Sequence, residues 1–154
     1  MVEGRVSRPG IGGVQVKALG RHFIADFHGC TTDLNDPAVI IGAMERACEV
    51  SGATVVDRTG HMFSPYGVTV MFVVAESHLA VHTWPEYGYA AVDVFTCGTT
   101  VDTQAAFESL KRDLKAQHVE YKEVVRGIMS DEGLACHSLE VTMMEVPHGT
   151  ISSS

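Results

Sequence analysis

The order of apolar and polar residues along the chain predicts a series of strands. Residues 68–75 and 89–97 are runs rich in valine and aromatic residues, a composition that strands favour. Further strands are predicted at residues 21–27, 53–57, 118–126 and 139–146, the last of them as an edge strand.

Two helices are predicted where apolar residues recur every three or four positions. Asp36 caps the first helix and Gly52 ends it. The second helix covers residues 104–117 and is capped by Asp102 or Thr103. The apolar positions are Val39, Ile40, Met44 and Ala47 in the first helix, and Ala106, Phe107, Leu110 and Leu114 in the second.

Strands interspersed with two helices predict an α+β fold. We expect a two-layer sandwich, in which about two helices pack on one face of an antiparallel β-sheet. Residues 1–19 are predicted to form a flexible or strand-edged leader, residues 61–67 a loop or bulged strand, and the tail from Pro147 a frayed end. Because no internal repeat or linker is evident, residues 1–154 are predicted to form a single domain.

Composition and charge argue against several classes of protein. Hydrophobic residues make up 45% of the chain, which indicates a globular protein rather than a disordered one. No apolar run reaches the roughly 20 residues of a membrane helix and no signal peptide is recognisable, so a cytoplasmic location is predicted. The net charge of -8, with only 11 lysines and arginines, argues against nucleic-acid binding. This charge suits a cationic substrate, although solubility explains it equally well.

Residues 75–89 concentrate side chains that carry out chemistry. We predict that they form a polar turn between the strands at 68–75 and 89–97. The candidates for chemistry in this turn are one hydroxyl, two imidazoles and one of its carboxylates, and a cysteine ends the strand that follows. These residues are Ser77, His78, His82, Glu86 and Cys97.

Each of these residues also has a purely structural interpretation. Ser77 can be an ordinary turn serine, and Cys97 can be a small buried apolar residue. His78 and His82 are four positions apart, so on a helix they would form a metal-binding pair. The neighbouring residues favour strand and turn and no third ligand is evident, so no metal site is predicted. The four cysteines form no Cys-x-x-Cys pair and are predicted to be free thiols.

Four segments carry a resemblance to a known family: residues 20–30, 65–68, 76–91 and 93–98. Together they resemble the short, prokaryotic S-adenosylmethionine decarboxylases over residues 18–127. The most specific part is Glu-Ser-His-Leu-Ala-Val-His-Thr-Trp-Pro-Glu, which begins at Glu76. The resemblance implies a carboxy-lyase that supplies the aminopropyl donor for polyamine (spermidine) biosynthesis.

The resemblance further implies a proenzyme that cuts itself between Glu76 and Ser77. The products are a β chain, residues 1–76, and an α chain, residues 77–154. In the family, the serine hydroxyl attacks the preceding carbonyl to give an ester, and elimination then leaves a pyruvoyl group at the new N-terminus. This cofactor forms a Schiff base with the substrate amine and acts as an electron sink, so that carbon dioxide can leave.

The resemblance also assigns roles to individual residues. It implies that His82 accepts a proton during processing and that Cys97 donates a proton during decarboxylation. Phe63 matches the aromatic residue that stacks on adenine, and Glu86 matches the carboxylate that holds the ribose hydroxyls. Thr69 is a departure, because the family commonly has a serine there. Threonine keeps the hydroxyl that supports processing and adds a methyl group that restricts χ1.

The implied partners are S-adenosylmethionine as substrate and a second copy of the chain, in a homodimer of processed protomers. Two alternatives remain open at the level of sequence. One keeps the fold and the pyruvoyl chemistry and decarboxylates arginine or ornithine. The other, from a different class, is an unprocessed homologue that serves as a binding or regulatory subunit, and Thr69 is the feature that points to it.

Overall fold

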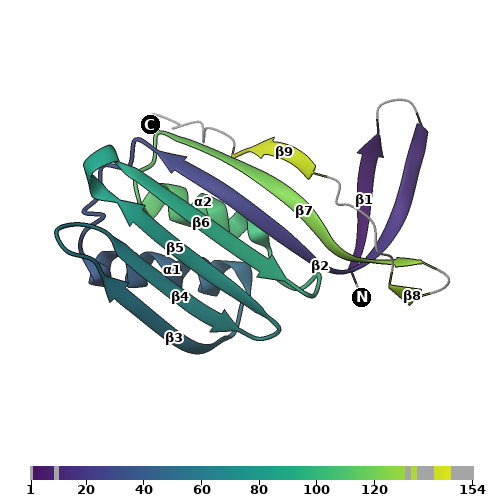
Figure 1. Ribbon diagram of the computed structural model, residues 1–154, viewed down its shortest axis with the longest axis horizontal. Helices are drawn as coiled ribbons and strands as arrows, with labels where there is room; N and C mark the ends of the chain where they lie inside the picture. Colours follow the sequence, from purple (N-terminus) through teal and green to yellow (C-terminus); the bar gives the residue numbers. More distant parts are fainter. Residues whose placement is uncertain (1, 9–10, 131–132, 135–140, 147–154) are drawn as a thin grey trace, which may run out of the picture.

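Figure 1 shows the computed structural model, which describes residues 2–8, 11–130, 133–134 and 141–146. In chain order, the elements in these residues are β1 (Val2–Arg8), β2 (Ile11–His28), α1 (Pro37–Ser51), β3 (Val55–Met62), β4 (Val68–Val74), β5 (Ser77–Trp84), the 3-10 helix η1 (Pro85–Tyr87), β6 (Tyr89–Thr96), α2 (Thr103–Asp113), β7 (His118–Ser130), β8 (Gly133–Leu134) and β9 (Val141–Glu145).

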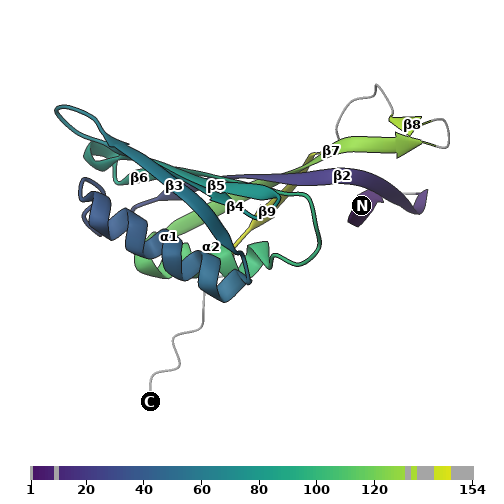
Figure 2. The ribbon, with the colours of Figure 1, turned by 90° about the horizontal axis from the view of Figure 1, so that it is seen from below.

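The strands form an antiparallel sheet whose main path runs in the order β3-β4-β5-β6-β2-β7-β8. Outside this path, β1 pairs with β2 and β9 pairs with β7. Figure 2 shows α1 and α2 on the same side of the sheet, so that the other face is left open. The predicted two-layer α+β sandwich is therefore confirmed.

Alternation along the central strands determines which face the helices cover. On β4, every second side chain is buried, and the side chains between them are half-buried or exposed. The buried set packs against apolar residues of both helices in one core. Phe107 on α2 is fully buried, and its ring lies 6.4, 6.2 and 4.9 Å from the rings of Phe23, Phe27 and Tyr121. These aromatic contacts fix α2 across β2 and β7.

The helix starts follow the predicted capping residues. The Asp36 carboxylate accepts a backbone hydrogen bond of 2.8 Å in the first turn of α1, and Gly52 ends that helix at φ 76°. The Asp102 carboxylate accepts an equivalent bond of 3.0 Å in α2. This helix ends at Asp113, earlier than predicted, because Lys115 takes a left-handed backbone conformation with φ 51°.

Several segments differ from the predicted elements. Within the predicted leader, β1 and the beginning of β2 form an antiparallel hairpin that projects beyond the helix-covered part of the sheet (Figure 1). The strand predicted at 53–57 is β3, which extends to Met62 and leaves residues 63–67 as the loop. The predicted edge strand is β9, while residues 139–140 and the tail from Pro147 lie outside the described residues. Neither α-helix in the described part is long and apolar enough to span a bilayer.

Candidate active site

The stretch predicted as one polar turn consists of a short turn followed by a full strand. Only Ala75 and Glu76 connect β4 to β5, since Val74 pairs with Ser77 across the turn. The prediction of a turn over residues 75–89 is therefore wrong for most of its length. Leu79, Val81 and Thr83 of β5 are buried on the helix side, and Ala80 between them is buried as well. The polar residues of this strand obscured the buried positions in the sequence.

Glu76 has an uncommon backbone conformation. Its φ is 60°, in the left-handed region that a residue with a side chain adopts at a cost of about 1–2 kcal/mol. The neighbouring backbone is anchored, because the Ala75 N–H donates to the carbonyl oxygen of Thr54 at 2.9 Å. The peptide bond between Glu76 and Ser77 thus follows directly after a residue that is held in a strained geometry.

Ser77 and Cys97 lie together at this end of the sheet. Ser77 pairs with Thr96, the residue before Cys97, and its hydroxyl donates to the carbonyl oxygen of Ala75 at 3.4 Å. On the helix side, Ser77 borders a crevice between the β4–β5 turn, the end of α1 and the start of α2. The other residues that line this crevice are mostly apolar and include Cys48, Ala53, Val74, Leu79, Val94 and Ala106.

The cysteines in the described part of the chain are free thiols, but their environments differ. Burial raises the pKa of Cys30 to about 11, and burial together with the charge of Glu45 raises the pKa of Cys48 to about 11. Both thiols therefore stay protonated and enclosed at neutral pH. Cys97 is only partly buried, so it is the accessible thiol next to Ser77. Cys136 lies outside the described residues.

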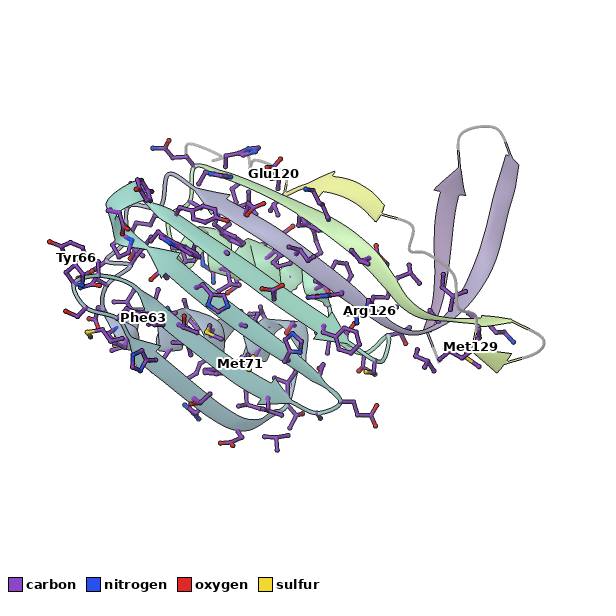
Figure 3. All side chains as sticks on the ribbon, in the orientation of Figure 1. Phe63, Tyr66, Met71, Glu120, Arg126 and Met129 are labelled. Carbon is purple, nitrogen blue, oxygen red and sulfur yellow. The ribbon has the colours of Figure 1, made fainter. Side chains whose placement is uncertain are left out.

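Thr69 and His82 form a second group at the opposite end of the same hairpin. They pair directly across β4 and β5, and Thr69 Oγ1 lies 2.9 Å from His82 Nδ1. Figure 3 shows Phe63 at this end of the sheet, where β3 turns into β4. Its side chain is 49% exposed and meets the ring of His61 at 4.7 Å. Glu86, in η1 just after β5, is exposed at the same end.

A single chain does not bring these two groups together. Ser77 and His82 are five residues apart on β5, so their side chains point to opposite faces of the sheet. At about 3.3 Å per residue, their Cα atoms are about 16 Å apart. His82 therefore lies far from Ser77 within one chain, whereas Cys97 directly follows Thr96, the residue that pairs with Ser77.

The face of the sheet that the helices leave uncovered carries both polar and apolar side chains. We call it the open face and define it by the strand alternation and register. Met71, Glu120 and Arg126 are labelled on it in Figure 3. Exposed apolar residues on it are Ile24 (40%), Met71 (38%), Val73 (45%) and Trp84 (40%). Its other members include His22, Asp26, Thr69, His78, His82, Tyr89, Ala91, Asp93 and Phe95.

An acid–phenol pair that was not predicted from the sequence lies near His82. The Tyr89 hydroxyl donates to the Asp26 carboxylate, and burial together with this hydrogen bond raises the pKa of Tyr89 to about 12. Asp26 lies in the same cross-strand row as His82, with only the small side chain of Ala91 between them. Alternation within each strand indicates a shared face, but the register between strands cannot be read from the sequence. Among the described residues, no group of three or more His, Cys, Asp or Glu is arranged to hold a metal ion.

A comparison with protein families defines the class to which the chain belongs. A model of the S-adenosylmethionine decarboxylase family matches residues 21–127, which include both groups of site residues. The chain therefore belongs to the S-adenosylmethionine decarboxylase family, and the family inferred from the sequence motifs is confirmed.

Individual relatives match most of the chain. The S-adenosylmethionine decarboxylase proenzyme of Thermotoga petrophila is 49% identical over 120 residues, which cover 77% of this chain and 92% of the relative. The proenzyme of Acidithiobacillus ferrooxidans is 45% identical over 127 residues, covering 82% and 96%. The crystal structure of the adenosylmethionine decarboxylase from Aquifex aeolicus superposes with a TM-score of 0.68 at 32% identity, covering 76% of this chain and 98% of that one.

Proposed function

We propose that the chain is a self-processing, pyruvoyl-dependent decarboxylase of S-adenosylmethionine. The observation that carries the proposal is the left-handed backbone of Glu76 directly before Ser77, inside the segment that the family model matches. Strain stored at a peptide bond can favour attack on that bond. Cleavage there gives a β chain of residues 1–76 and an α chain of residues 77–154.

The surroundings of Ser77 fit a pyruvoyl group derived from it. The mostly apolar crevice beside Ser77 suits a small group without a charge, and the free thiol of Cys97 directly follows the neighbouring strand β6. When present, the group supplies an electron sink for the loss of carbon dioxide. Cys97 holds a proton at Sγ and returns it to the substrate carbon from which carbon dioxide has left.

Thr69 prepares His82 to accept a proton in the cleavage step. When Nδ1–H of His82 donates to Thr69 Oγ1, the other ring nitrogen, Nε2, is the basic atom. The hydroxyl that the family supplies from a serine is thus present on this threonine, in direct contact with the imidazole. This contact favours an active processing site over the alternative of an unprocessed binding subunit.

A homodimer completes the site, because one chain places Ser77 and His82 far apart. The two groups lie at opposite ends of a sheet whose open face carries exposed apolar side chains. If two open faces pack together about a twofold axis that lies between the sheets, parallel to them and perpendicular to the strands, each end meets the opposite end of its partner. His82 of one chain would then approach the backbone of Ser77 of the other chain from the open face.

The same packing of two open faces would place the substrate-binding residues of one chain near Ser77 of the other. Phe63 offers an exposed ring to the adenine, and Glu86 offers an exposed carboxylate to the ribose hydroxyls. Both lie at the His82 end and would reach the partner's Ser77. An adenosyl substrate with a cationic sulfonium agrees with the net charge of -8, and its decarboxylated product would supply spermidine synthesis.

Self-cleavage is tested by denaturing electrophoresis and mass spectrometry of the purified chain. We expect two fragments, residues 1–76 and 77–154, the second of which should react with hydrazine through its carbonyl group. Ser77→Ala should give one intact chain. A single full-length band without a reactive carbonyl would overturn the proposal and favour a binding or regulatory subunit.

The substrate is tested by measuring carbon dioxide release from S-adenosylmethionine, arginine and ornithine side by side. We expect release from S-adenosylmethionine alone, and a higher KM after Phe63→Ala or Glu86→Gln, because these changes remove contacts to the adenosine. Preferential release from arginine or ornithine would be compatible with the proposed self-cleavage but would reject S-adenosylmethionine as the substrate.

A further inference from the structure

His78, the residue after Ser77, lies in a cluster of side chains that the proposed reaction does not use. The register places His78 opposite Phe95 on β6, and Phe95 opposite His22 on β2, all on the open face. The His78 ring stacks on Phe95 with centroids 5.8 Å apart and an angle of 20° between the planes. It also meets the ring of His22 edge-on at 5.9 Å. Ring contacts therefore hold His78 on two sides.

His22 is itself fixed by charged neighbours. Its Nε2 lies 3.1 Å from Asp93 Oδ1, and its Nδ1 lies 3.5 Å from Arg126 Nη1. A guanidinium can only donate, so Nδ1 accepts and Nε2–H donates to the carboxylate. The Arg126 guanidinium also lies over the Phe95 ring, 5.8 Å from its centroid. Both ring nitrogens of His22 are thus engaged.

The ring nitrogens of His78, in contrast, have no hydrogen-bond partner in the described part of the chain. Burial, and next the neighbouring His22, lower the pKa of His78, while Asp93 acts weakly in the opposite direction. On β4 the residue facing His78 is Val73, which carries no charge. At neutral pH the imidazole is therefore uncharged, and one of its nitrogens can accept a proton.

Covalent geometry limits how far His78 can lie from the reacting carbon, and His78 lines the same crevice as Ser77. The Cα atoms of Ser77 and His78 are about 3.8 Å apart across their peptide bond, whatever happens to residues 1–76. The substrate amine has to attack the carbon derived from Ser77 Cα, and only the free base has a lone pair for this attack. An α-ammonium group with a pKa of about 8 is mostly protonated at pH 7, so a base is needed at this point.

We propose that a ring nitrogen of His78 accepts the proton from the substrate's ammonium group, and that His22, Asp93 and Phe95 position the ring. The N–H electron pair stays on the substrate nitrogen as the attacking lone pair, and the imidazole becomes imidazolium, which later releases its proton to water. The role is general-base catalysis at the step before decarboxylation, separate from the roles of His82 and Cys97. It rests on the proposed function.

The experiment measures covalent capture of the substrate amine rather than turnover. Self-cleaved protein is mixed with the methyl ester of S-adenosylmethionine, which keeps the amine and lacks a free carboxylate, and with sodium cyanoborohydride. Mass spectrometry then gives the rate at which the 77–154 chain gains the mass of the ligand. His78→Phe keeps the stack on Phe95 without a basic nitrogen, and His118→Phe is the matched control at the other end of the open face.

We expect capture at pH 7 to be at least about tenfold slower in His78→Phe and unchanged in His118→Phe. At pH 9 the amine is largely a free base, so the defect should shrink to about threefold or less. Capture at the wild-type rate at pH 7, or a defect of the same size at both pH values, would overturn the role of His78. Failure of the wild-type chain to cleave or to capture the ligand would instead reject the proposed function.

A second measurement covers the case in which His78→Phe does not fold or cleave. Wild-type self-cleaved protein, labelled with nitrogen-15 in its histidines, is titrated with the same methyl ester without the reductant. We expect the ring nitrogen signals of His78 to shift on binding, while those of His118 stay in place. Unchanged His78 signals at saturating ligand would reject the inference.

Discussion

Glu76 and Lys115 are the residues other than glycine that have a positive φ in the described part of the chain, at 60° and 51°. Lys115 follows the end of α2, where a left-handed residue is a common way to finish a helix. Glu76 lies in a two-residue hairpin turn, where Gly, Asn or Asp normally takes such a conformation. No helix end or short side chain accounts for Glu76, so we relate its conformation to the reaction at the next peptide bond.

Glu76→Gly removes the penalty that a side chain adds to this conformation. In a Ser77→Ala background, which keeps the chain whole, we expect the free energy of unfolding in urea to rise by about 1 kcal/mol. In the Ser77 background we expect slower self-cleavage, because strain no longer favours the attack. Lys115→Gly is the matched control, which should stabilise similarly and leave cleavage unchanged. If Glu76→Gly cleaves as fast as this control, the strain at Glu76 has no part in the reaction.

At the scale of elements, local chemistry was sufficient to predict the helices but not β5. Asp36 predicts a helix start because its carboxylate can accept a backbone hydrogen bond, and Gly52 predicts a helix end because it has no side chain. Both residues are found at the ends of α1. β5 could be predicted as a strand only by recognising that Leu79 and Val81 form a buried face. The two histidines in the same segment favoured a functional turn instead. Strand identity depends here on burial against distant helices, which no local signal supplies.

The candidate site residues were proposed from the sequence motifs, which did not predict how these residues are grouped in space. An odd separation along a strand places two side chains on opposite faces, so assigning β5 as a strand separates Ser77 from His82. The pairing of Thr69 with His82 and the row from His78 to His22 depend on the register between strands. Register is set by packing of the whole sheet and is only weakly encoded in any one strand.

Gly20 on β2 has no side chain, which leaves room for the ring of Phe95 on the neighbouring strand β6. A Cβ at Gly20 would lie 2.6 Å from Phe95 Cζ and 3.0 Å from the carbonyl oxygen of Thr96. We expect Gly20→Ala to lower the free energy of unfolding of the Ser77→Ala chain by about 1–3 kcal/mol. In a Phe95→Leu background the same change should cost less, and a double-mutant cycle in urea measures the difference. An equal cost in both backgrounds would show that Phe95 is not the limiting neighbour.

The whole molecule presents its candidate chemical groups at the two ends of one sheet. In the proposed function, the group formed by Glu76, Ser77 and Cys97 contains the bond to be cut, and the group around His82 contains the base and the adenosine contacts. Apolar residues lie on the face between them. Such an arrangement suits two chains that share two sites, with each chain giving one group to each site.

Mixing two inactive variants tests this sharing directly. His82→Ala and Ser77→Ala chains, carrying different tags and expressed alone, should each stay intact. In a mixed dimer, Ser77 of the first chain meets His82 of the second, so we expect the His82→Ala chain to be cleaved and its partner to stay whole. Mass spectrometry of each tagged chain gives the cleaved fraction.

The control for this experiment pairs His82→Ala with a chain that carries both Ser77→Ala and His82→Ala, and no cleavage should return. If the His82→Ala chain also stays intact in the first mixture, although the two tags are recovered together as dimers, His82 acts on the serine of its own chain.

The order of the strands determines what a cut can do to the molecule. β2, β3 and β4 come from residues 1–76, whereas β5, β6 and β7 come from residues 77–154. Because β2 is inserted between β6 and β7, the two pieces are interlaced within one sheet. Neither piece can leave without losing the hydrogen bonds on both sides of β2. If the proposed cut occurs after Glu76, folding has to precede it. A cut molecule that unfolds would have to find its other half again by diffusion, so the cut would make maturation a one-way event.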